Sequence, residues 1–395
     1  MATKKAYTFV DLFAGCGGMS LGFELAGFRP IAAIEKDAWA AQTYSFNRKS
    51  TNVHVIDITK INKPLDFLGV KPFAIDGVVG GPPCQGFSLS GNRDPKDPRN
   101  SLFMDYMRFV RDLKPKFFVM ENVPGILSAQ TKKKEKVYQL VLKVATDAGY
   151  NVHIFKLTAD KYGVPQSRHR VFFIGIRIDL PFAPSKLKPK EILGKISIDE
   201  AIGDLPVLKA GEGVEHATYP IKPQNAFQTW CRKGSTCVSN HISMRHTPRL
   251  IERFAQIQYG QSVADVPNEH RQRKRGNASQ ISGKTYSQNN MRPFPNLPSP
   301  TIPASFQSNF VHPHANRNYT AREGARLQSF PDRYVFQGKR TTMSWEKNLS
   351  QYQQIGNAVP PLLAKAIADA ISKYLNNLEN IKTEKPNDNQ TTLWD

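Results

Sequence analysis

Short apolar segments alternate with amphipathic stretches through the first half of this 395-residue chain. The apolar segments have the length and composition of strands, and they read YTFVDLF, RPIAAIE, IDGVVGG, KFFVMEN and RVFFIGI. The stretches SLGFELAGF and RNSLFMDYMRFVRDL have apolar residues at helical spacing. Alternation of this kind constrains the chain to an α/β fold, a doubly wound and mostly parallel sheet with helices on both faces.

The composition and the periodicity of the sequence change near residue 180. Prolines, glycines and basic runs such as HRQRKRG then replace the regular periodicity until about residue 320. Helical spacing returns in TAREGARLQSF and in PPLLAKAIADAISKYL, whose leading prolines suit the first turn of a helix. We therefore expect a first domain at 1–180, a smaller loop-rich domain at 181–320, helices at 321–380 that return to the first domain, and a disordered tail at 381–395.

The charge of the chain favours a polyanionic partner. Lysine and arginine total 54 against 33 acidic residues, a formal charge of +21, and nucleic acid is the leading candidate. No apolar run is long enough to span a membrane, and Asp11 interrupts the N-terminal apolar stretch, so no secretory leader is expected. Four cysteines do not make a disulfide framework in so long a chain, and we expect a cytoplasmic protein without membrane association.

The segment DLFAGCGGMSLGF puts Gly15, Gly17 and Gly18 between a strand and a helix, where glycine lets the backbone approach a ligand. The third glycine of the dinucleotide pattern is replaced by Ser20, and no lysine follows as in a phosphate-binding loop. Asp11, just before the loop, would repel phosphate and attract an ammonium group. The loop is therefore not expected to bind pyrophosphate.

Glu35 ends the next strand, about 20 residues beyond the loop, where an acid can accept hydrogen bonds from ribose hydroxyls. A ribose-bearing, positively charged ligand without phosphate describes S-adenosylmethionine. A glycine-rich structural turn explains this loop equally well when the loop is taken alone.

A cysteine follows two prolines in the segment GGPPCQGFS. Pro82 and Pro83 hold the chain extended, which presents Cys84 at the carboxyl end of a strand, where ligands bind in open α/β sheets. Cys84 is a candidate nucleophile where neighbouring positive charge favours the thiolate. The alternative is a small buried hydrophobic residue, against which the prolines and the polar loop from Gln85 to Asn100 argue.

Glu121 occupies the corresponding position after the strand KFFVM, so a carboxylate could meet the thiol at one edge of the sheet. Alone, Glu121 could equally be a surface residue or a helix cap. In QSRHRVFF, Arg168 and Arg170 stand two apart at the start of a strand and should project from one face, where they could bind a carbonyl, a carboxylate or phosphate. Exposed arginine pairs are common, so this signal is weak by itself.

Six segments, taken in order, resemble the ordered motifs of the DNA cytosine-5 methyltransferases, in particular bacterial restriction-modification enzymes. They are DLFAGCGG, GGPPCQGFS, MENV, QSRHR, AREGARLQSFP and QIGNAVPP, and they span nearly the whole chain except its middle. The resemblance implies that the Cys84 thiolate adds to carbon 6 of cytosine, so that carbon 5 can attack a methyl group. It also implies that Glu121 protonates ring nitrogen 3, and that Arg170 with Arg168 steadies the base and the nucleophile.

The same resemblance assigns S-adenosylmethionine as the cofactor. Phe13 would meet the face of the adenine and Glu35 the ribose. Asp57 with Ile58 would meet the adenine edge, and Asn357 the methionine end. The full implied cofactor-binding set is Phe13, Ala14, Gly15, Gly17, Gly18, Glu35, Asp57, Ile58, Pro83, Asn357 and Ala358.

Double-stranded DNA is the implied substrate, and its target cytosine must be flipped out of the helix. By similarity, Gln85, Ser88 and Arg99 contact the DNA, and residues 181–320 form a target-recognition domain that reads bases in the major groove. A cognate restriction endonuclease would act on the same site without a stable complex. We expect a monomer, since one cytosine needs one active site.

Other functions remain open at this level. A methyltransferase acting on transfer RNA shares the chemistry, although the long middle segment favours DNA. A regulator that binds DNA without catalysis would explain the charge but not the conjunction of Cys84, Glu121 and the arginine pair. A nicotinamide oxidoreductase is weakened by Asp11 and by the missing third glycine. The spacing of Cys231, Cys237, His241 and His246 matches no common zinc site, so no metal is expected.

Overall fold

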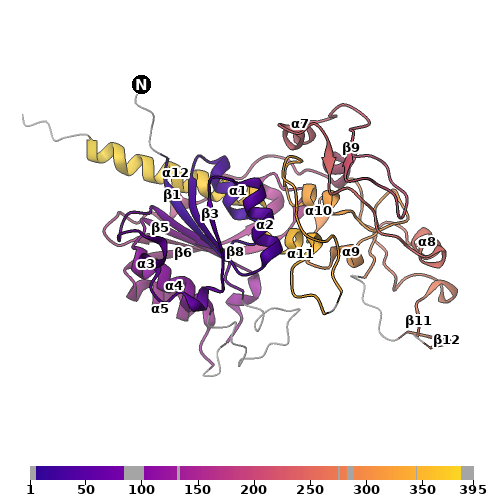
Figure 1. Cartoon of the computed structure of the whole chain (residues 1–395), viewed down its shortest axis with the longest axis horizontal. Helices are drawn as coiled ribbons and strands as arrows, with labels where there is room; N and C mark the ends of the chain where they lie inside the picture. The colour runs from indigo at the N-terminus through magenta and orange to yellow at the C-terminus, as the bar shows by residue number, and fades with distance from the viewer. Residues whose placement is uncertain are drawn as a thin grey trace, which may run out of the picture.

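The computed structural model describes residues 6–83, 102–130, 134–274, 276–282, 289–343 and 345–383. Within these residues a seven-stranded sheet has the order β3-β2-β1-β4-β5-β8-β6 (Figure 1). Its strands are β1 (Thr8–Leu12), β2 (Arg29–Glu35), β3 (Asn52–Val55), β4 (Gly77–Gly80), β5 (Phe117–Asn122), β6 (Tyr150–Thr158) and β8 (His169–Arg177). Neighbours are parallel except that β8 runs antiparallel to β5 and β6. The predicted α/β fold with a mostly parallel sheet is confirmed.

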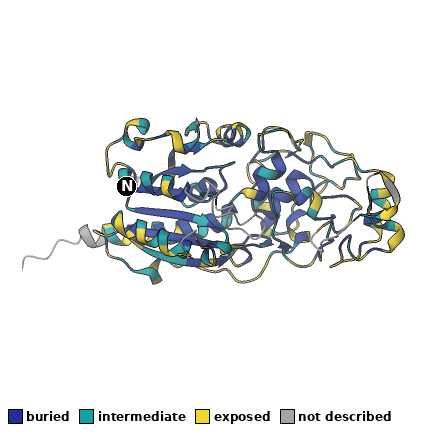
Figure 2. Ribbon diagram, turned by 90° about the horizontal axis from the view of Figure 1, so that it is seen from below, coloured by how far each residue is buried: buried dark blue, intermediate teal, exposed yellow. Residues whose placement is uncertain are grey.

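Helices cover both faces of this sheet because its strands alternate buried side chains between two apolar cores. Phe117 and Val119 face the core that contains α1 (Gly18–Leu25) and α12 (Pro361–Thr383). Phe118 and Met120 face the core that contains α3 (Pro64–Leu68), α4 (Leu102–Leu113) and α5 (Val137–Asp147). Figure 2 shows the strands between these layers in the colour of buried residues. Strands buried on both sides read as continuous apolar runs, which is why the sequence revealed them.

The rest of the chain is built from short elements, drawn beside the sheet in Figure 1. Its helices are α6 (Ile198–Ile202), α7 (Ala226–Arg232), α8 (Pro248–Ala255), α9 (Phe306–Asn309), α10 (Ala321–Leu327) and α11 (Gln351–Asn357). Its strands pair two by two, as β9 (His216–Ala217) with β10 (Val238–Ser239), and β11 (Arg273–Lys274) with β12 (Asn277–Ile281). In a further pair, β13 (Ser299–Pro300) joins β7 (Gln166–Ser167), which directly precedes β8 in the chain.

Helix α2 (Ala38–Asn47) follows β2, and single turns of 3-10 helix complete the described structure. They are η1 (Ile58–Lys60), η4 (Pro124–Leu127), η5 (Ala159–Tyr162), η6 (Pro184–Leu187) and η7 (Asn268–His270). No described helix is both long enough and apolar enough to pass through a lipid bilayer.

The C-terminal helices divide between the two parts of the molecule. α12 returns to the sheet and packs against α1. α10 instead lies in a third apolar core with α6, α7 and α11, so only part of the segment 321–380 covers the sheet. α12 also continues to Thr383, three residues into the segment 381–395 that we expected to be a disordered tail. The division of the chain into domains otherwise stays a prediction.

Candidate active site at the carboxyl ends of the strands

Glu121 and Arg170 form an ion pair at the carboxyl edge of the sheet. β8 runs antiparallel beside β5, with Asn122 opposite Val171, so the start of β8 meets the end of β5. Nε of Arg170 lies 2.7 Å from Oε1 of Glu121, and the two side chains are 12% and 14% exposed. Burial lowers the pKa of Arg170, and Glu121 opposes that shift by stabilising the charged guanidinium. An acid and a cation therefore meet at this edge of the sheet.

The same carboxylate lies beside the chain that leads to Cys84. A Cβ placed on Gly81 would lie 3.0 Å from Oε2 of Glu121, so a larger residue at this position would crowd the carboxylate. Pro83 is half-buried and ends this described segment. Cys84 itself lies outside the described residues, as do the predicted DNA contacts Gln85, Ser88 and Arg99.

Asn122 is a residue of this edge that our sequence analysis did not single out. Its side chain is buried, and Nδ2 donates a hydrogen bond of 3.0 Å to the carbonyl oxygen of Pro82, two residues before Cys84. Asn122 therefore ties the end of β5 to the chain beyond β4. The available signal was its place directly after Glu121 in MENV, where an amide can bind a neighbouring backbone.

Arg168 has different partners from Arg170. β8 begins at His169, so the alternation of a strand does not extend to Arg168. Its guanidinium is 2% exposed and donates to the carbonyl oxygens of Ile302 at 2.8 Å and Gly356 at 2.9 Å. Burial, together with the charge of Arg170, lowers its pKa well below the ordinary value. These contacts join the edge of the sheet to two later segments, and a part for Arg168 in the chemistry stays a prediction.

The three glycines of the N-terminal loop differ in what they approach. Gly15 has a φ of +54° and nothing within 4 Å of the position of a Cβ, so the space above it is open to a ligand. Gly17 and Gly18 instead approach the protein itself. A Cβ on Gly17 would lie 2.6 Å from Nη1 of Arg48, and one on Gly18 would lie 2.3 Å from the carbonyl oxygen of Val359. Close packing alone therefore explains these two glycines.

Glu35 is anchored beside the open part of this loop. Its carboxylate accepts hydrogen bonds from the backbone nitrogen of Gly15 at 2.7 Å and from that of Asp37 at 2.8 Å. Burial raises the pKa of Glu35, while the two backbone donors oppose that shift. Phe13 is half-buried with a φ of +55°, and Ala14 is buried and hydrogen-bonds to Ile34. These contacts fix the loop and the acid relative to each other.

Asp11 does not face a ligand, which corrects the expectation that it attracts an ammonium group. It is 1% exposed, and its carboxylate accepts a hydrogen bond of 2.6 Å from Oγ of Ser20, a residue of α1. Burial raises the pKa of Asp11 to about 7. The residue therefore connects β1 to α1 inside the protein, and the open space above Gly15 must draw its selectivity from other groups.

The remaining predicted cofactor residues lie on two further segments. Asp57 accepts a hydrogen bond from the backbone nitrogen of Thr59, which lowers its pKa, and Ile58 beside it is buried. Asn357 is exposed at the end of α11. Ala358 follows, with its Cβ 3.3 Å from the position of a Cβ on Gly18, so the segment QIGNAVPP and the glycine loop are in contact.

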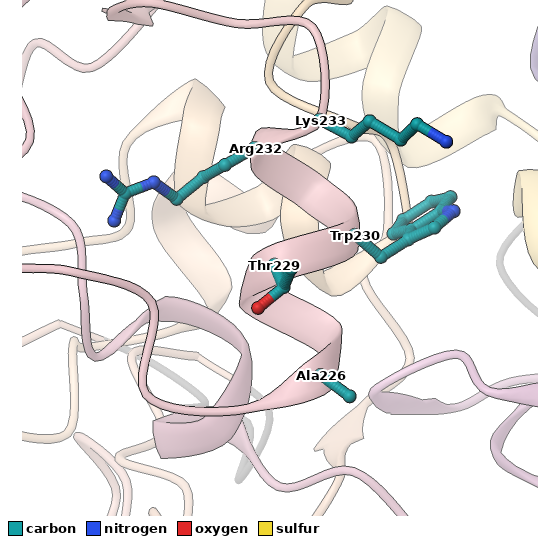
Figure 3. A pocket seen from close by; sticks show the side chains of 5 residues that line it. All are labelled: Ala226, Thr229, Trp230, Arg232 and Lys233. Carbon is teal, nitrogen blue, oxygen red and sulfur yellow. The ribbon is translucent and has the colours of Figure 1, made fainter.

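A hollow of about 640 Å³ lies outside this edge, on α7 in the segment 181–320. Figure 3 shows Trp230 and Lys233 pointing to one side of the helix and Arg232 to the other. The guanidinium of Arg232 lies 3.7 Å from the centre of the Tyr219 ring and forms an ion pair of 3.3 Å with Asp204. Lys233 is exposed, so it can meet an anion without breaking an internal contact.

The side chains considered for zinc have other roles. Cys231 is fully buried in the third apolar core, and burial raises its pKa. His241 hydrogen-bonds to Thr320 and to the carbonyl oxygen of Pro206. These contacts account for both residues without a metal ion.

Comparison with known proteins agrees with this geometry. A family model of C-5 cytosine-specific DNA methylases matches residues 7–373. Type II methyltransferase M.DdeI of Desulfomicrobium norvegicum is 60% identical over 378 residues, which cover 94% of this chain and 90% of the relative. Type II methyltransferase M1.HphI of Haemophilus parahaemolyticus is 34% identical over 377 residues, which cover 94% and 88%.

Solved structures give the same result. A DNA modification methyltransferase encoded within an E. coli prophage superimposes with a TM-score of 0.72 at 28% identity, over 95% of this chain and 100% of the other. DNMT2 of Spodoptera frugiperda superimposes with a TM-score of 0.56 at 16% identity, over 94% and 100%, and shows the fold alone. The chain therefore belongs to the C-5 cytosine-specific DNA methylase family and is a DNA cytosine-5 methyltransferase of the restriction-modification type.

Proposed function

We propose that the enzyme flips one cytosine out of a specific duplex site and methylates its carbon 5 through a covalent adduct with Cys84, with S-adenosylmethionine as the methyl donor. One observation carries this proposal. The carboxylate of Glu121 lies against Arg170 and beside Gly81, at the strand end from which the chain proceeds to Cys84. An acid, a cation and a nucleophile would thus act on one base.

The reaction begins with the thiolate of Cys84, which forms a bond to carbon 6 of the flipped base. Electron density moves to carbon 5, which then accepts the methyl group. A base next removes the proton from carbon 5, and the bond between sulfur and carbon 6 breaks. The thiolate is released unchanged, so the cysteine acts as a catalyst.

Glu121 holds and protonates ring nitrogen 3, which offsets the negative charge that develops as the thiolate adds. Arg170 orients the carboxylate from one side, since the ion pair fixes Oε1. Asn122 holds the carbonyl oxygen of Pro82 and thereby steadies the approach of the chain to Cys84. Arg168 contributes by fixing two backbone segments around this edge.

The residues beside the glycine loop suit S-adenosylmethionine. The carboxylate of Glu35 can accept hydrogen bonds from ribose hydroxyls while Gly15 and Asp37 hold it in place. Phe13, Asp57 and Ile58 would contact the adenine, and Asn357 with Ala358 the methionine end. Gly15 leaves room for the backbone to approach the ligand. When bound, S-adenosylmethionine supplies an electrophilic methyl group at a sulfonium.

Access to the target requires the cytosine to leave the duplex, because its ring carbons are not reachable within the stack. Gln85, Ser88 and Arg99 would contact the DNA around the vacated position. Residues 181–320 would read the flanking bases, and their cations would neutralise phosphates. Methylation of such a site would protect host DNA from a cognate restriction endonuclease. We further propose that the enzyme acts as a monomer in the cytoplasm.

Transfer of labelled methyl from S-adenosylmethionine to duplex DNA of mixed sequence tests this function, with transfer RNA in parallel and base-resolution mapping of the product. We expect methyl at carbon 5 of cytosine within one short DNA motif. Transfer to RNA alone would instead indicate a transfer RNA enzyme. The variant Cys84→Ala should retain DNA binding and lose transfer, whereas Cys237→Ala, a change at a half-buried cysteine, should retain both.

A duplex with 5-fluorocytosine at the mapped position tests the covalent step. Fluorine cannot leave carbon 5 as a proton does, so the adduct should accumulate on the wild-type enzyme and on Cys237→Ala. Methyl transfer by Cys84→Ala at the wild-type rate would exclude the covalent mechanism.

A further inference from the structure

A groove of about 850 Å³ lies along α12, outside the candidate active site. Tyr162 and Leu362 contribute apolar surface to its lining. Its cations are Lys186, Lys188, Lys190, Lys365 and Lys373, and Asp369 is the carboxylate among its described lining residues. The groove thus combines an apolar floor with a strongly basic rim.

Three of these lysines form a row that runs from the last turn of η6 into the chain that follows it. Leu187 and Pro189 are buried, whereas Lys186, Lys188 and Lys190 are exposed. Lys188 has extended backbone angles, with φ of −68° and ψ of 122°. The two buried residues anchor this stretch, and the three exposed lysines that alternate with them line the groove together.

The opposite wall adds two lysines of α12. Lys365, Asp369 and Lys373 stand four residues apart and so lie on one face of the helix. Nζ of Lys365 lies 2.6 Å from Asp369, which neutralises that carboxylate. Lys373 and the three lysines of the row form no ion pair with any residue that the structure describes, so their charge is available to a ligand.

Nearby carboxylates do not cancel this charge. Glu191 follows the lysine row, but it forms an ion pair of 3.3 Å with Lys161. Asp160 lies 3.0 Å from Nζ of Lys195. The acidic groups around the groove are therefore already paired, and the excess positive charge persists at its surface.

The groove begins close to the catalytic edge of the sheet without being part of it. Tyr162 lies in η5, which directly follows β6, and Thr158 at the end of β6 pairs with His169 next to Arg170. From there the groove extends along α12 to Asn377. A long duplex held at the catalytic edge has DNA on either side of its target, and the groove is a basic surface next to that edge.

We propose that this groove binds phosphates of the DNA backbone without regard to sequence, as a contact separate from the one that positions the target cytosine. Lysine ammonium groups act on phosphates as point charges, and their apolar stems can lie over the floor of the groove. DNA is favoured over an acidic protein because DNA is the substrate of this enzyme. Such a contact would raise the affinity for long DNA and leave the chemistry unchanged.

The triple variant Lys186→Gln/Lys188→Gln/Lys190→Gln tests the proposal, with Lys49→Gln/Lys71→Gln/Lys143→Gln as the control, since those three lysines are exposed elsewhere. Binding to a long duplex without the target site is measured by fluorescence anisotropy over a range of salt concentrations. Each lost phosphate contact lowers the slope of log affinity against log salt by about 0.9, so the slope should fall by about 2 to 3 in the groove variant. The control should retain the wild-type slope.

The rate of methylation of a short duplex tests whether the groove contributes to catalysis as well as to DNA binding. On a short duplex that just covers the mapped site, at saturating DNA, kcat of the groove variant should equal that of the wild type. Equal slopes in the two triple variants would overturn the proposal, since general charge would then explain the binding. Loss of kcat on the short duplex by a folded groove variant would also overturn it. The slope of log affinity against log salt is measured without methyl transfer, so it tests the groove even if the proposed mechanism is wrong.

Discussion

Different interactions stabilise the interior of the sheet and the interior of the part of the chain that follows it. The sheet is packed by apolar side chains such as Phe9, Phe117 and Ile174, each fully buried between strands and helices. Among the largest fully buried side chains of the described structure are also Arg317, Arg322 and Arg326, which lie beyond the sheet. Charged residues thus occupy interior positions in the part of the molecule that has the least regular structure.

One arginine cluster joins four segments around α10. Arg326 donates to both carboxylate oxygens of Asp332, at 2.9 and 2.6 Å, and forms an ion pair with Asp204. Burial opposes the charge of Arg326, but Asp332 outweighs it and raises the pKa. Arg322 donates to the carbonyl oxygens of Ser239 at 2.8 Å and Tyr334 at 2.7 Å.

Arg292 likewise connects several backbone segments near α8. Arg292 donates to the carbonyl oxygens of Ile257 and Phe254, each at 2.7 Å, and to those of His312 at 2.6 Å and Pro313 at 2.9 Å. Ile257, His312 and Pro313 lie outside helices and strands, so their carbonyls have no ladder partner, and a guanidinium supplies five donors. Buried arginines therefore replace the hydrogen bonds that regular structure would provide, at the cost of removing a charge from water.

The largest effect should come from breaking the cluster around α10. Arg326→Met removes the nearest cation from the buried carboxylates of Asp204 and Asp332, which should lower the free energy of unfolding by about 3–5 kcal/mol. The cations that stay are farther away, Arg232 at 3.3 Å from Asp204 and Arg322 at 3.7 Å from Asp332. Urea denaturation measures the change. Arg111 has an exposed ion pair with Asp112, and Arg111→Met should cost less than about 1 kcal/mol. Similar losses for both variants would remove the distinction between buried and exposed arginines.

Removal of Arg292 should lower the free energy of unfolding by less than removal of Arg326. Arg292→Met removes the donor of the carbonyl groups of Ile257, His312 and Pro313, and we expect a loss of about 2–3 kcal/mol. Hydrogen exchange should increase first in α8 and around Ile257 rather than in the sheet. Equal increases throughout the protein would instead mean that the two parts unfold as one cooperative unit.

The buried carboxyl group of Asp11 in β1 should make the free energy of unfolding depend on pH. The pKa of Asp11 is raised to about 7, so between about pH 4 and 7 the folded protein binds a proton that the unfolded chain releases. Stability conferred by this proton is present at low pH and is lost as pH rises, by about 2 kcal/mol between about pH 5 and 7.

Asp11→Asn keeps an acceptor for Ser20 but cannot titrate, so its free energy of unfolding should lack this decline. Asp66→Asn, a change at an exposed carboxylate, should behave as the wild type does. Chemical denaturation at several pH values measures the three curves. A decline that persists in Asp11→Asn would assign the pH dependence to another group.

The smallest effect should come from the apolar core. Ile174→Val removes one buried methylene from β8 and should cost about 1 kcal/mol, because the surrounding packing can relax around so small a change. The same substitution at Ile178, which is 63% exposed, should cost less than about 0.5 kcal/mol. A loss at Ile174 as large as that of Arg326→Met would contradict the contrast drawn between the two parts.

The sequence predicted the sheet better than it predicted the remainder. Five strands were recognised because they are buried on both faces. β3 and β6 were missed, since both are edge strands whose polar residues interrupt the apolar pattern, as in NVHV and YNVHIFKLT. The helices α2 (Ala38–Asn47) and α5 were missed as well. In the segment 181–320, partners such as Arg292 and His312 are distant in sequence, and no local periodicity reports them.

Some residues of the candidate site could be identified from the sequence, and others could not. Glu121 and Arg170 were identifiable because strand ends of one sheet converge on one edge. Asn122 and the partners of Arg168 were not, since their hydrogen bonds depend on where other backbone segments pass. Asp11 was misassigned because a carboxylate at a strand end can turn toward a helix as well as toward a ligand, and only the contact with Ser20 decides between them.

The antiparallel pairing of β5 with β8 has a consequence for how this enzyme could be re-engineered. The register between the two strands, and not the length of chain between residues 123 and 168, brings Arg170 to Glu121. That connection could be lengthened, or cut and rejoined in a circular permutant, while the pair kept its spacing. A single-residue slip of β8, by contrast, would turn Arg170 to the opposite face of the sheet. The spacing of Glu121 and Arg170 in the candidate active site therefore depends on the strand register and not on the length of the connecting chain.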